Sequence, residues 1–198
     1  VAIGIEGLST VSIIAYTISF GILLVAGLLL IILGFEILES PLVVIASTII
    51  PLSLSLLVLL RAAADGGTWI FLLCAIVFAG DTAALYAGTL WGRHRLSPAI
   101  SPGKTFEGSL AGLAAGLAVG AVGQAAFLPE WGWPAGLLFA AAVGVAGQAG
   151  DLFESALKRA SNVKDSGGLL PGHGGVLDRI DALLFAAPVA FGLRTALQ

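Results

Sequence analysis

Long apolar segments separated by short polar ones occupy most of the 198-residue chain. A helix needs about 20 apolar residues to cross the roughly 30 Å hydrocarbon layer of a bilayer. Because lipid offers the backbone no hydrogen-bond partner, segments that cross it are expected to be helices. Six segments approach or exceed that length, at about residues 10–34, 41–60, 68–91, 108–128, 134–151 and 179–197. The pattern predicts an all-α fold, a polytopic transmembrane helix bundle with about six spanning helices.

The composition supports the same class of fold. Hydrophobic residues make up 58% of the chain and charged residues 11%, and the mean hydropathy is +1.04. Soluble domains contain about 25% charged residues, so the composition argues against a soluble globule. The single cysteine, Cys74, excludes a disulfide within the chain. The chain starts at Val1 and contains no methionine, so we expect residues 1–67 to be a truncated set of N-terminal transmembrane helices.

The charged residues concentrate in two polar segments. Thirteen of the 21 charged residues, and both histidines, lie within residues 91–108 and 151–181. Two predicted spans separate these segments, which places both segments on one side of the membrane. Their lysines and arginines indicate that this side is cytoplasmic. We therefore expect residues 68–198 to form a catalytic transmembrane domain with cytoplasmic loops 92–107 and 152–178.

The second of these segments carries candidate metal ligands. From Asp151 onward, helical spacing places Glu154, Ser155 and Lys158 on one face, so this helix is expected to continue as an amphipathic helix. Asp178 opens the next predicted span, and antiparallel neighbours bring it to the membrane side of Asp151. Two carboxylates, with water and phosphate oxygens, suit Mg²⁺. Four cations could hold the phosphates that such a metal bridges: Lys158, Arg159, Lys164 and Arg179.

Two glycine-containing stretches are candidates for phosphate binding. Residues 167–175 lead into a predicted helix, whose N-terminus favours anions. Backbone N–H groups can approach a phosphate closely at four of these positions, namely Gly172, His173, Gly174 and Gly175. Residues 101–105, Ser-Pro-Gly-Lys-Thr, lack the first glycine and the preceding strand of a true P-loop. Even so, we expect Lys104, with Ser101 and Thr105, to contact a phosphate or nucleotide.

Asp81 lies near the middle of a predicted span, where a charged side chain is costly and usually functional. It either pairs with a cation from another helix or shares a polar cavity with Asp151 and Asp178. Both alternatives place a polar group inside the helix bundle.

Other residues are interpreted as structural. Glycines recur every fourth residue at Gly108, Gly112, Gly116 and Gly120. This glycine face lets another helix approach closely, either within the chain or across a dimer interface. Tryptophans near the ends of predicted spans are typical interfacial anchors, namely Trp69, Trp91, Trp131 and Trp133. Arg194, near the end of the last span, is interpreted as a solvated residue.

Several motifs together resemble the signature of phosphatidate cytidylyltransferases, also called CDP-diacylglycerol synthases. The signature runs through Ser155-Ala-Leu-Lys158-Arg159 and Lys164-Asp165-Ser166-Gly167 to PGHGGVLDRID at 171–181. GD at 80–81, SPGKTFEG at 101–108 and GDLFES at 150–155 also resemble the family and occur in the same order. The resemblance covers about residues 68–190.

The resemblance implies an Mg²⁺-dependent transfer of CMP from CTP to phosphatidic acid, which gives CDP-diacylglycerol and pyrophosphate. It implies that Asp151 and Asp178 hold the metal with Asp81 nearby, and it leaves room for a monovalent cation such as K⁺. It implies that Lys104 and the four cations named above bind the phosphates of CTP and of the lipid. It also implies that the Gly172–Gly175 loop closes over the nucleotide. It further implies a homodimer in the inner membrane, with the active site facing the cytoplasm and no nucleic acid as partner.

Three alternatives stay open at this point. A related CTP-dependent lipid enzyme, such as a polyprenol or phytol kinase or a CDP-archaeol synthase, is not expected to keep PGHGGVLDRID whole. An ion or proton transporter would use Asp81, Asp151 and Asp178 as a pathway, with carboxylates spread through the membrane and inverted repeats. An inactive structural partner would have lost a motif position. The grouping of charge in two segments favours the enzyme.

Overall fold

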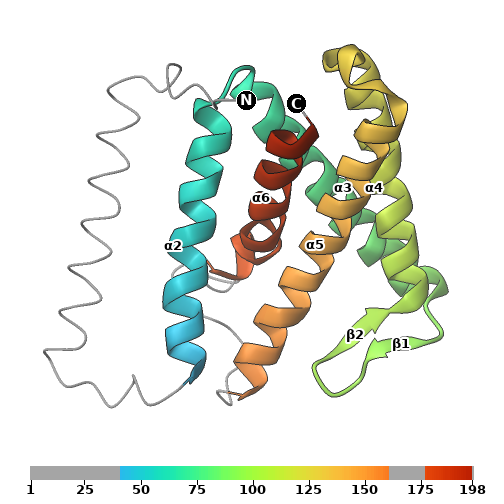
Figure 1. Ribbon diagram of the computed structural model, residues 1–198. Coiled ribbons are helices and arrows are strands. Elements are labelled where there is room, and N and C mark those ends of the chain that lie inside the picture. Colours follow the sequence, from blue (N-terminus) through green and yellow to red (C-terminus); the bar gives the residue numbers. More distant parts are fainter. Residues whose placement is uncertain (1–40, 161–176, 198) are drawn as a thin grey trace, which may run out of the picture.

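The computed structural model describes residues 41–160 and 177–197 of the chain. These residues form a bundle of helices with one small hairpin (Figure 1). In chain order the elements are α2 Pro41–Ala62, α3 Gly66–Trp91, β1 Arg95–Ser97, β2 Ser101–Thr105, α4 Phe106–Phe127, a 3₁₀ turn Pro129–Trp131, α5 Gly132–Ala160 and α6 Leu177–Leu197. The prediction of a helical bundle is confirmed.

Four helical segments of the described part are long and apolar enough to cross a bilayer. They are Gly66–Trp91, Phe106–Phe127, Pro129–Ala160 and Ile180–Leu197. A shorter apolar helix, Ile49–Ala62, belongs to α2. The span expected at 10–34 lies outside the described residues. Four of the predicted spans are therefore confirmed as membrane-type helices, and the count of six stays a prediction.

Helix α5 extends beyond the apolar segment that the sequence predicts. We predicted an apolar core at 134–151, and the helix continues to Ala160, as the polar stripe after Asp151 indicates. Phe153 on this extension packs against Phe185 of α6, with ring centroids 5.0 Å apart. The extension is thus held against the bundle on its apolar side.

Helices α3 and α4 pack through the glycine face of α4. A Cβ added to Gly112 would lie 2.7 Å from the carbonyl oxygen of Gly80, and one added to Gly108 would lie 2.7 Å from that of Ala84. Only glycine permits this backbone approach. Of the two alternatives for this face, close packing within the chain is confirmed at these positions.

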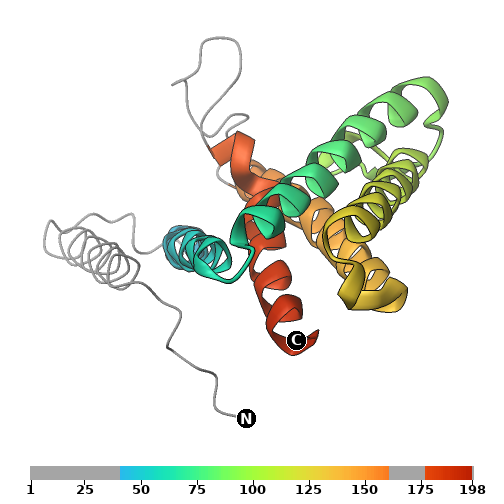
Figure 2. The same cartoon turned by 90° about the horizontal axis from the view of Figure 1, so that it is seen from above.

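The core extends along α3 from Trp69 to Val77 and along α6 from Ala182 to Ala190. Helix α6 packs between α2 and α5 (Figures 1 and 2). Trp69 is only 2% exposed and packs on Trp131, with ring centroids 4.5 Å apart. Arg194, 8% exposed, donates to the carbonyl of Ala64 and lies over the Trp69 ring. The interfacial role of Trp69 and the solvated position of Arg194 are therefore wrong. Trp131 and Phe139 pack on Trp69, and Arg194 lies between Trp69 and the turn that joins α2 to α3.

Residues 92–107 are not a plain loop, which corrects the expectation for this segment. Strands β1 and β2 pair antiparallel, with Arg95 opposite Thr105 and Ser97 opposite Ser101. Strands of three and five residues carry too little alternation to be recognised from sequence. The segment therefore has a fixed shape at the end of α3 (Figure 1).

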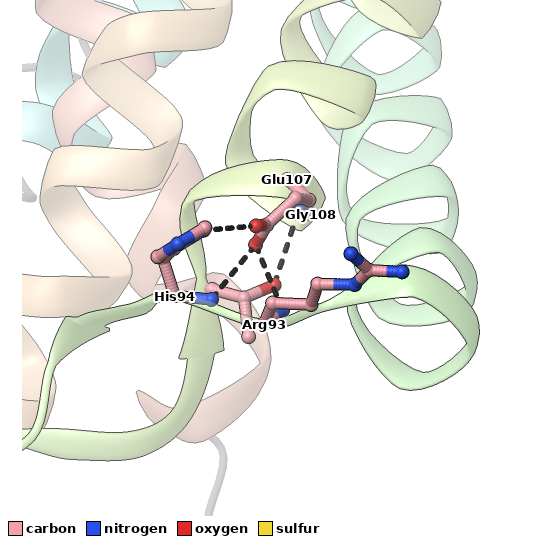
Figure 3. A network of polar contacts seen from close by, with 5 residues as sticks. Arg93, His94, Glu107 and Gly108 are labelled. Atoms are coloured by element: carbon pink, nitrogen blue, oxygen red, sulfur yellow. Dashed lines mark hydrogen bonds and ion pairs between the residues drawn. The ribbon is translucent and has the colours of Figure 1, made fainter.

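Glu107, in the first turn of α4, fastens the start of the hairpin (Figure 3). Its carboxylate accepts the backbone N–H groups of Arg93 and His94 at 3.2 and 3.3 Å and contacts Nδ1 of His94 at 2.6 Å. The guanidinium of Arg93 points away from this carboxylate (Figure 3). The β2 strand ends at Thr105, which caps α4 by accepting the Gly108 N–H.

Candidate active site

A cavity of about 730 Å³ opens between α3, the hairpin, α4, α5 and α6. Residues of the hairpin line one side of it, and the core residues Val77 and Ala182 line another. Its polar lining consists of Asp81, Thr89, Ser101, Lys104, Thr105, Ser109, Gln148, Asp151, Lys158 and Asp181. Its apolar lining includes Val77, Phe78, Leu85, Leu96, Leu152 and Leu183. The cavity thus offers charged and hydrocarbon-like surface to the same occupant.

Three carboxylates from three different helices line this cavity: Asp81 of α3, Asp151 of α5 and Asp181 of α6. The close packing of α3 on the glycines of α4 places Asp81 of α3 beside the cavity. Asp181 accepts the N–H of Ala182 at 2.7 Å. Of the two alternatives for Asp81, the structure shows the shared polar cavity with Asp151.

Lys104 and Asp151 form an ion pair across the cavity wall, with Nζ and Oδ2 separated by 2.6 Å. A second contact joins the same two elements, since Nε of Arg159 donates to the carbonyl of Ile100 at 3.2 Å. The hairpin therefore contacts α5 at two places, near the end of β2 at Lys104 and just before its start at Ile100. A predicted phosphate ligand, Lys104, and a predicted metal ligand, Asp151, are direct neighbours.

Lys158 lines the cavity and pairs with Glu154 one turn earlier on α5, at 2.5 Å. Glu154 is 4% exposed. A charge removed from water to this extent needs a partner of opposite charge. Glu154 therefore fixes where the Lys158 ammonium lies.

The cavity fits a hydrated divalent cation better than a preformed metal cage. Among the described side chains, no group of three or more His, Cys, Asp and Glu is placed to hold a metal by itself. Yet the lining holds three carboxylates against two lysines. Mg²⁺ keeps several waters and is usually bound by one or two carboxylates plus substrate phosphates. This donor set is compatible with that mode of binding.

Comparison with known proteins assigns the chain to a family. The sequence model of the Cytidylyltransferase family matches residues 4–197. The chain belongs to the cytidylyltransferase family. Its relatives include the phosphatidate cytidylyltransferases of Bacillus subtilis (strain 168), 42% identical over 128 residues, and of Brucella suis biovar 1, 43% identical over 126 residues. The enzyme of the same name from Synechocystis is 46% identical over 119 residues.

The matches cover only part of each protein. They span 65%, 64% and 59% of this chain, and 48%, 46% and 40% of the three relatives. The chain therefore spans about half the length of the curated relatives it matches.

The structure brings together some of the family residues proposed from sequence. Those that line one cavity are Asp81, Ser101, Lys104, Thr105, Asp151 and Lys158. Arg159 instead contacts the hairpin backbone, and Asp178 and Arg179 belong to the first turn of α6. Lys164, Gly172, His173, Gly174 and Gly175 lie outside the described residues.

Four polar residues that line the cavity were not proposed from sequence, namely Thr89, Ser109, Gln148 and Asp181. Asp181 was visible three positions after Asp178 but was not assigned to the site. Gln148 lies three residues before Asp151 on α5, and its amide bonds Ser109 of α4. Spacing to Asp151 was the available signal for Gln148, whereas nothing in the local sequence marks Ser109.

Proposed function

We propose that this cytidylyltransferase transfers CMP from CTP to phosphatidic acid and releases pyrophosphate. The observation that carries the proposal is the cavity in which acidic and lysine side chains meet an apolar wall. A nucleotide triphosphate and a lipid phosphate are both anionic, and one of them also carries hydrocarbon. The names of the relatives support the same reaction.

The chemistry needs positioning more than proton transfer. A phosphate oxygen of phosphatidic acid attacks the α-phosphorus of CTP. The bond between the α-phosphorus and the oxygen that joins it to the β-phosphorus breaks, and the β- and γ-phosphates leave together as pyrophosphate. The attacking phosphate is already ionised, so no strong general base is required. Rate enhancement then comes from alignment of the two phosphates and from neutralisation of their charge.

Each group of residues takes a distinct role in this proposal. Asp151 and Asp178, with Asp81, would hold Mg²⁺, and Asp181 adds a further carboxylate to the cavity. Bound Mg²⁺ would neutralise charge on the phosphates, and the excess of carboxylates leaves room for K⁺. The phosphates would be held by Lys104, Lys158, Arg159, Lys164 and Arg179. Ser101, Thr105 and the backbone of Gly172, His173, Gly174 and Gly175 would complete the nucleotide site.

The apolar lining gives the lipid a way in. Phe78, Leu85 and Leu183 lie beside the acidic residues, so a glycerol backbone and acyl chains could stay in an apolar environment. CTP would enter from water at the hairpin end. We further propose the inner membrane as the location, with this end facing the cytoplasm, and a homodimer as the assembly.

The function is tested with the complete protein in membrane vesicles. CTP labelled at the α-phosphate is supplied with phosphatidic acid and Mg²⁺, and the lipid fraction is analysed. We expect label in CDP-diacylglycerol, and its loss in Asp151→Asn and with EDTA. CTP labelled at the γ-phosphate serves as the control. Label from the γ-phosphate in lipid would identify a kinase and contradict the proposal.

A further inference from the structure

We propose that Gln148 is a positioning residue that, through Ser109, holds Asp151 in its working place in the cavity. This proposal rests on the proposed function and adds to it a part of the site that no signature motif marks. Gln148 and Ser109 both line the cavity. Neither is needed for the charge chemistry described above, so their position calls for another explanation.

The two residues form a reciprocal pair between α4 and α5. The hydroxyl of Ser109 donates to Oε1 of Gln148, and Nε2 of Gln148 donates to the carbonyl oxygen of Ser109 at 3.0 Å. Two bonds in opposite directions fix both the rotation and the position of the amide. The partners are 39 residues apart in sequence, so the pair fixes the relation of two helices rather than a local turn.

This pair runs parallel to the Lys104–Asp151 ion pair. Gln148 lies three residues before Asp151, which is nearly one turn along the same face of α5. Ser109 lies in α4 just after Thr105, the N-cap that follows Lys104. The same two parts of the chain are thus joined twice, once by charge and once by the amide. The Gln148 amide thus fixes the position of Asp151 along α5 relative to Lys104.

A third helix meets the other two at the same level. A Cβ added to Gly112 would lie 3.3 Å from Nε2 of Gln148 and 2.7 Å from the carbonyl oxygen of Gly80. Gly80 directly precedes Asp81 on α3. The amide therefore lies where the helices that carry Asp81 and Asp151 approach α4. Any shift of Gln148 changes the relative positions of these two carboxylates.

The test compares Gln148→Leu with a matched glutamine at the other end of the same helix pair. Gln124 of α4 is 5% exposed, donates to the carbonyl of Leu128 and lies against Gly136 of α5, outside the cavity. In the complete protein we expect Gln148→Leu to lower kcat by about tenfold or more, with KM for CTP changed less than about twofold. Gln124→Leu is expected to keep kcat within about twofold.

Ser109 supplies the conservative pair of variants. Ser109→Ala is expected to lower kcat in the same direction as Gln148→Leu. Ser109→Thr keeps the hydroxyl and is expected to restore most of the activity. A loss that is equal in both Ser109 variants would contradict a role for the hydroxyl–amide bond.

Binding of Mn²⁺ without CTP, followed by electron paramagnetic resonance, gives a readout independent of catalysis. We expect Gln148→Leu, but not Gln124→Leu, to weaken Mn²⁺ binding, because Asp151 is no longer held in place. Unchanged kcat and Mn²⁺ binding in Gln148→Leu would overturn the proposal. So would a raised KM for CTP at constant kcat, which indicates direct substrate contact. An unmodified protein that binds Mn²⁺ but transfers no CMP would instead contradict the proposed function alone.

Discussion

At the scale of single residues, the cavity carboxylates differ in the cations beside them. Asp151 is paired with Lys104 at 2.6 Å, whereas Glu154 next to the cavity is paired with Lys158. Asp181 binds a backbone N–H of its own helix. A cation that binds Asp151 therefore shares this carboxylate with Lys104. Removal of this lysine is expected to change metal binding and phosphate binding in opposite directions.

Lys104→Met is predicted to tighten Mn²⁺ binding in the absence of CTP and to weaken CTP. Removal of one positive charge beside Asp151 should strengthen binding of the divalent cation by about tenfold, and loss of a phosphate ligand should lower kcat/KM by about 100-fold. Titration calorimetry and steady-state kinetics measure the two effects. Arg93→Gln is the control, because the Arg93 guanidinium points away from the Glu107 network (Figure 3). Weaker Mn²⁺ binding in Lys104→Met would contradict this assignment.

At the scale of elements, two features position the cavity wall. The glycine face of α4 brings α3 close, and Glu107 ties the hairpin to the first turn of α4. The glycine spacing was readable from the sequence, because a period of four on a helix places residues on one face. The hairpin could not be predicted from the sequence, because its strands are too short to show an alternating pattern. The Glu107 carboxylate and contacts with α5 hold it in place.

Gly112→Ala is predicted to separate α3 from α4. The added Cβ meets the Gly80 carbonyl oxygen at 2.7 Å, so one backbone must move. Overpacking of this kind lowers the free energy of unfolding by about 1–3 kcal/mol, and Tm by roughly 2–4 °C for each kcal/mol. Thermal unfolding in detergent measures the change. A Cβ added to Gly192 on α6 meets nothing within 4 Å, so Gly192→Ala should leave Tm equal or slightly higher, because alanine favours the helix. An equal loss in both variants would refute the packing explanation.

Glu107→Ala is predicted to loosen the start of the hairpin. The N–H groups of Arg93 and His94 lose their acceptor, and a hydrogen bond of this kind contributes about 1 kcal/mol. Its loss is expected to make exchange of these amides about fivefold faster. Hydrogen–deuterium exchange over residues 93–105 measures the effect. His94→Gln keeps both backbone bonds and should change the exchange much less. Protection that is unaltered in Glu107→Ala would show that other contacts hold the hairpin.

At the scale of the whole molecule, the cavity adjoins the buried core, since Val77 and Ala182 belong to both, whereas the cluster around Trp69 lies at the far end of the bundle. The hairpin, the end of α5 and the start of α6 surround the cavity, whereas Trp69, Trp131 and Arg194 pack at the other end. Helix α4 runs from one end to the other, since it begins at the hairpin and ends at the 3₁₀ turn. The end with the hairpin therefore carries the polar cavity, and the other end carries the aromatic packing around Trp69.

Opposite membrane sides are predicted for the two ends of α4. In a Cys74→Ser background, Ala99→Cys on the exposed hairpin turn should react with an impermeant maleimide only from the cytoplasmic side. Glu130→Cys, exposed beyond the far end of α4, should react only from the opposite side. Right-side-out and inverted vesicles give the two accessibilities. Labelling of both positions from one side would contradict the topology.

The class of fold, most helix limits and the grouping of charge could be read from the sequence. Each depends on local composition: lipid selects long apolar helices, and charged residues collect where the chain leaves it. The four glycines of α4 could likewise be placed on one face, because helical geometry is the same in every context.

Which of these residues contact one another depends on the packing of helices that are distant in the sequence. Trp69 and Trp91 both lie near ends of α3, yet the first is 2% exposed and the second 70%, because α6 and the 3₁₀ turn cover one end alone. The Lys104–Asp151 pair likewise depends on the separation of the hairpin from α5, and the Ser109–Gln148 pair on the separation of α4 from α5. That separation is set by side-chain and backbone packing between distant segments, which no local pattern encodes.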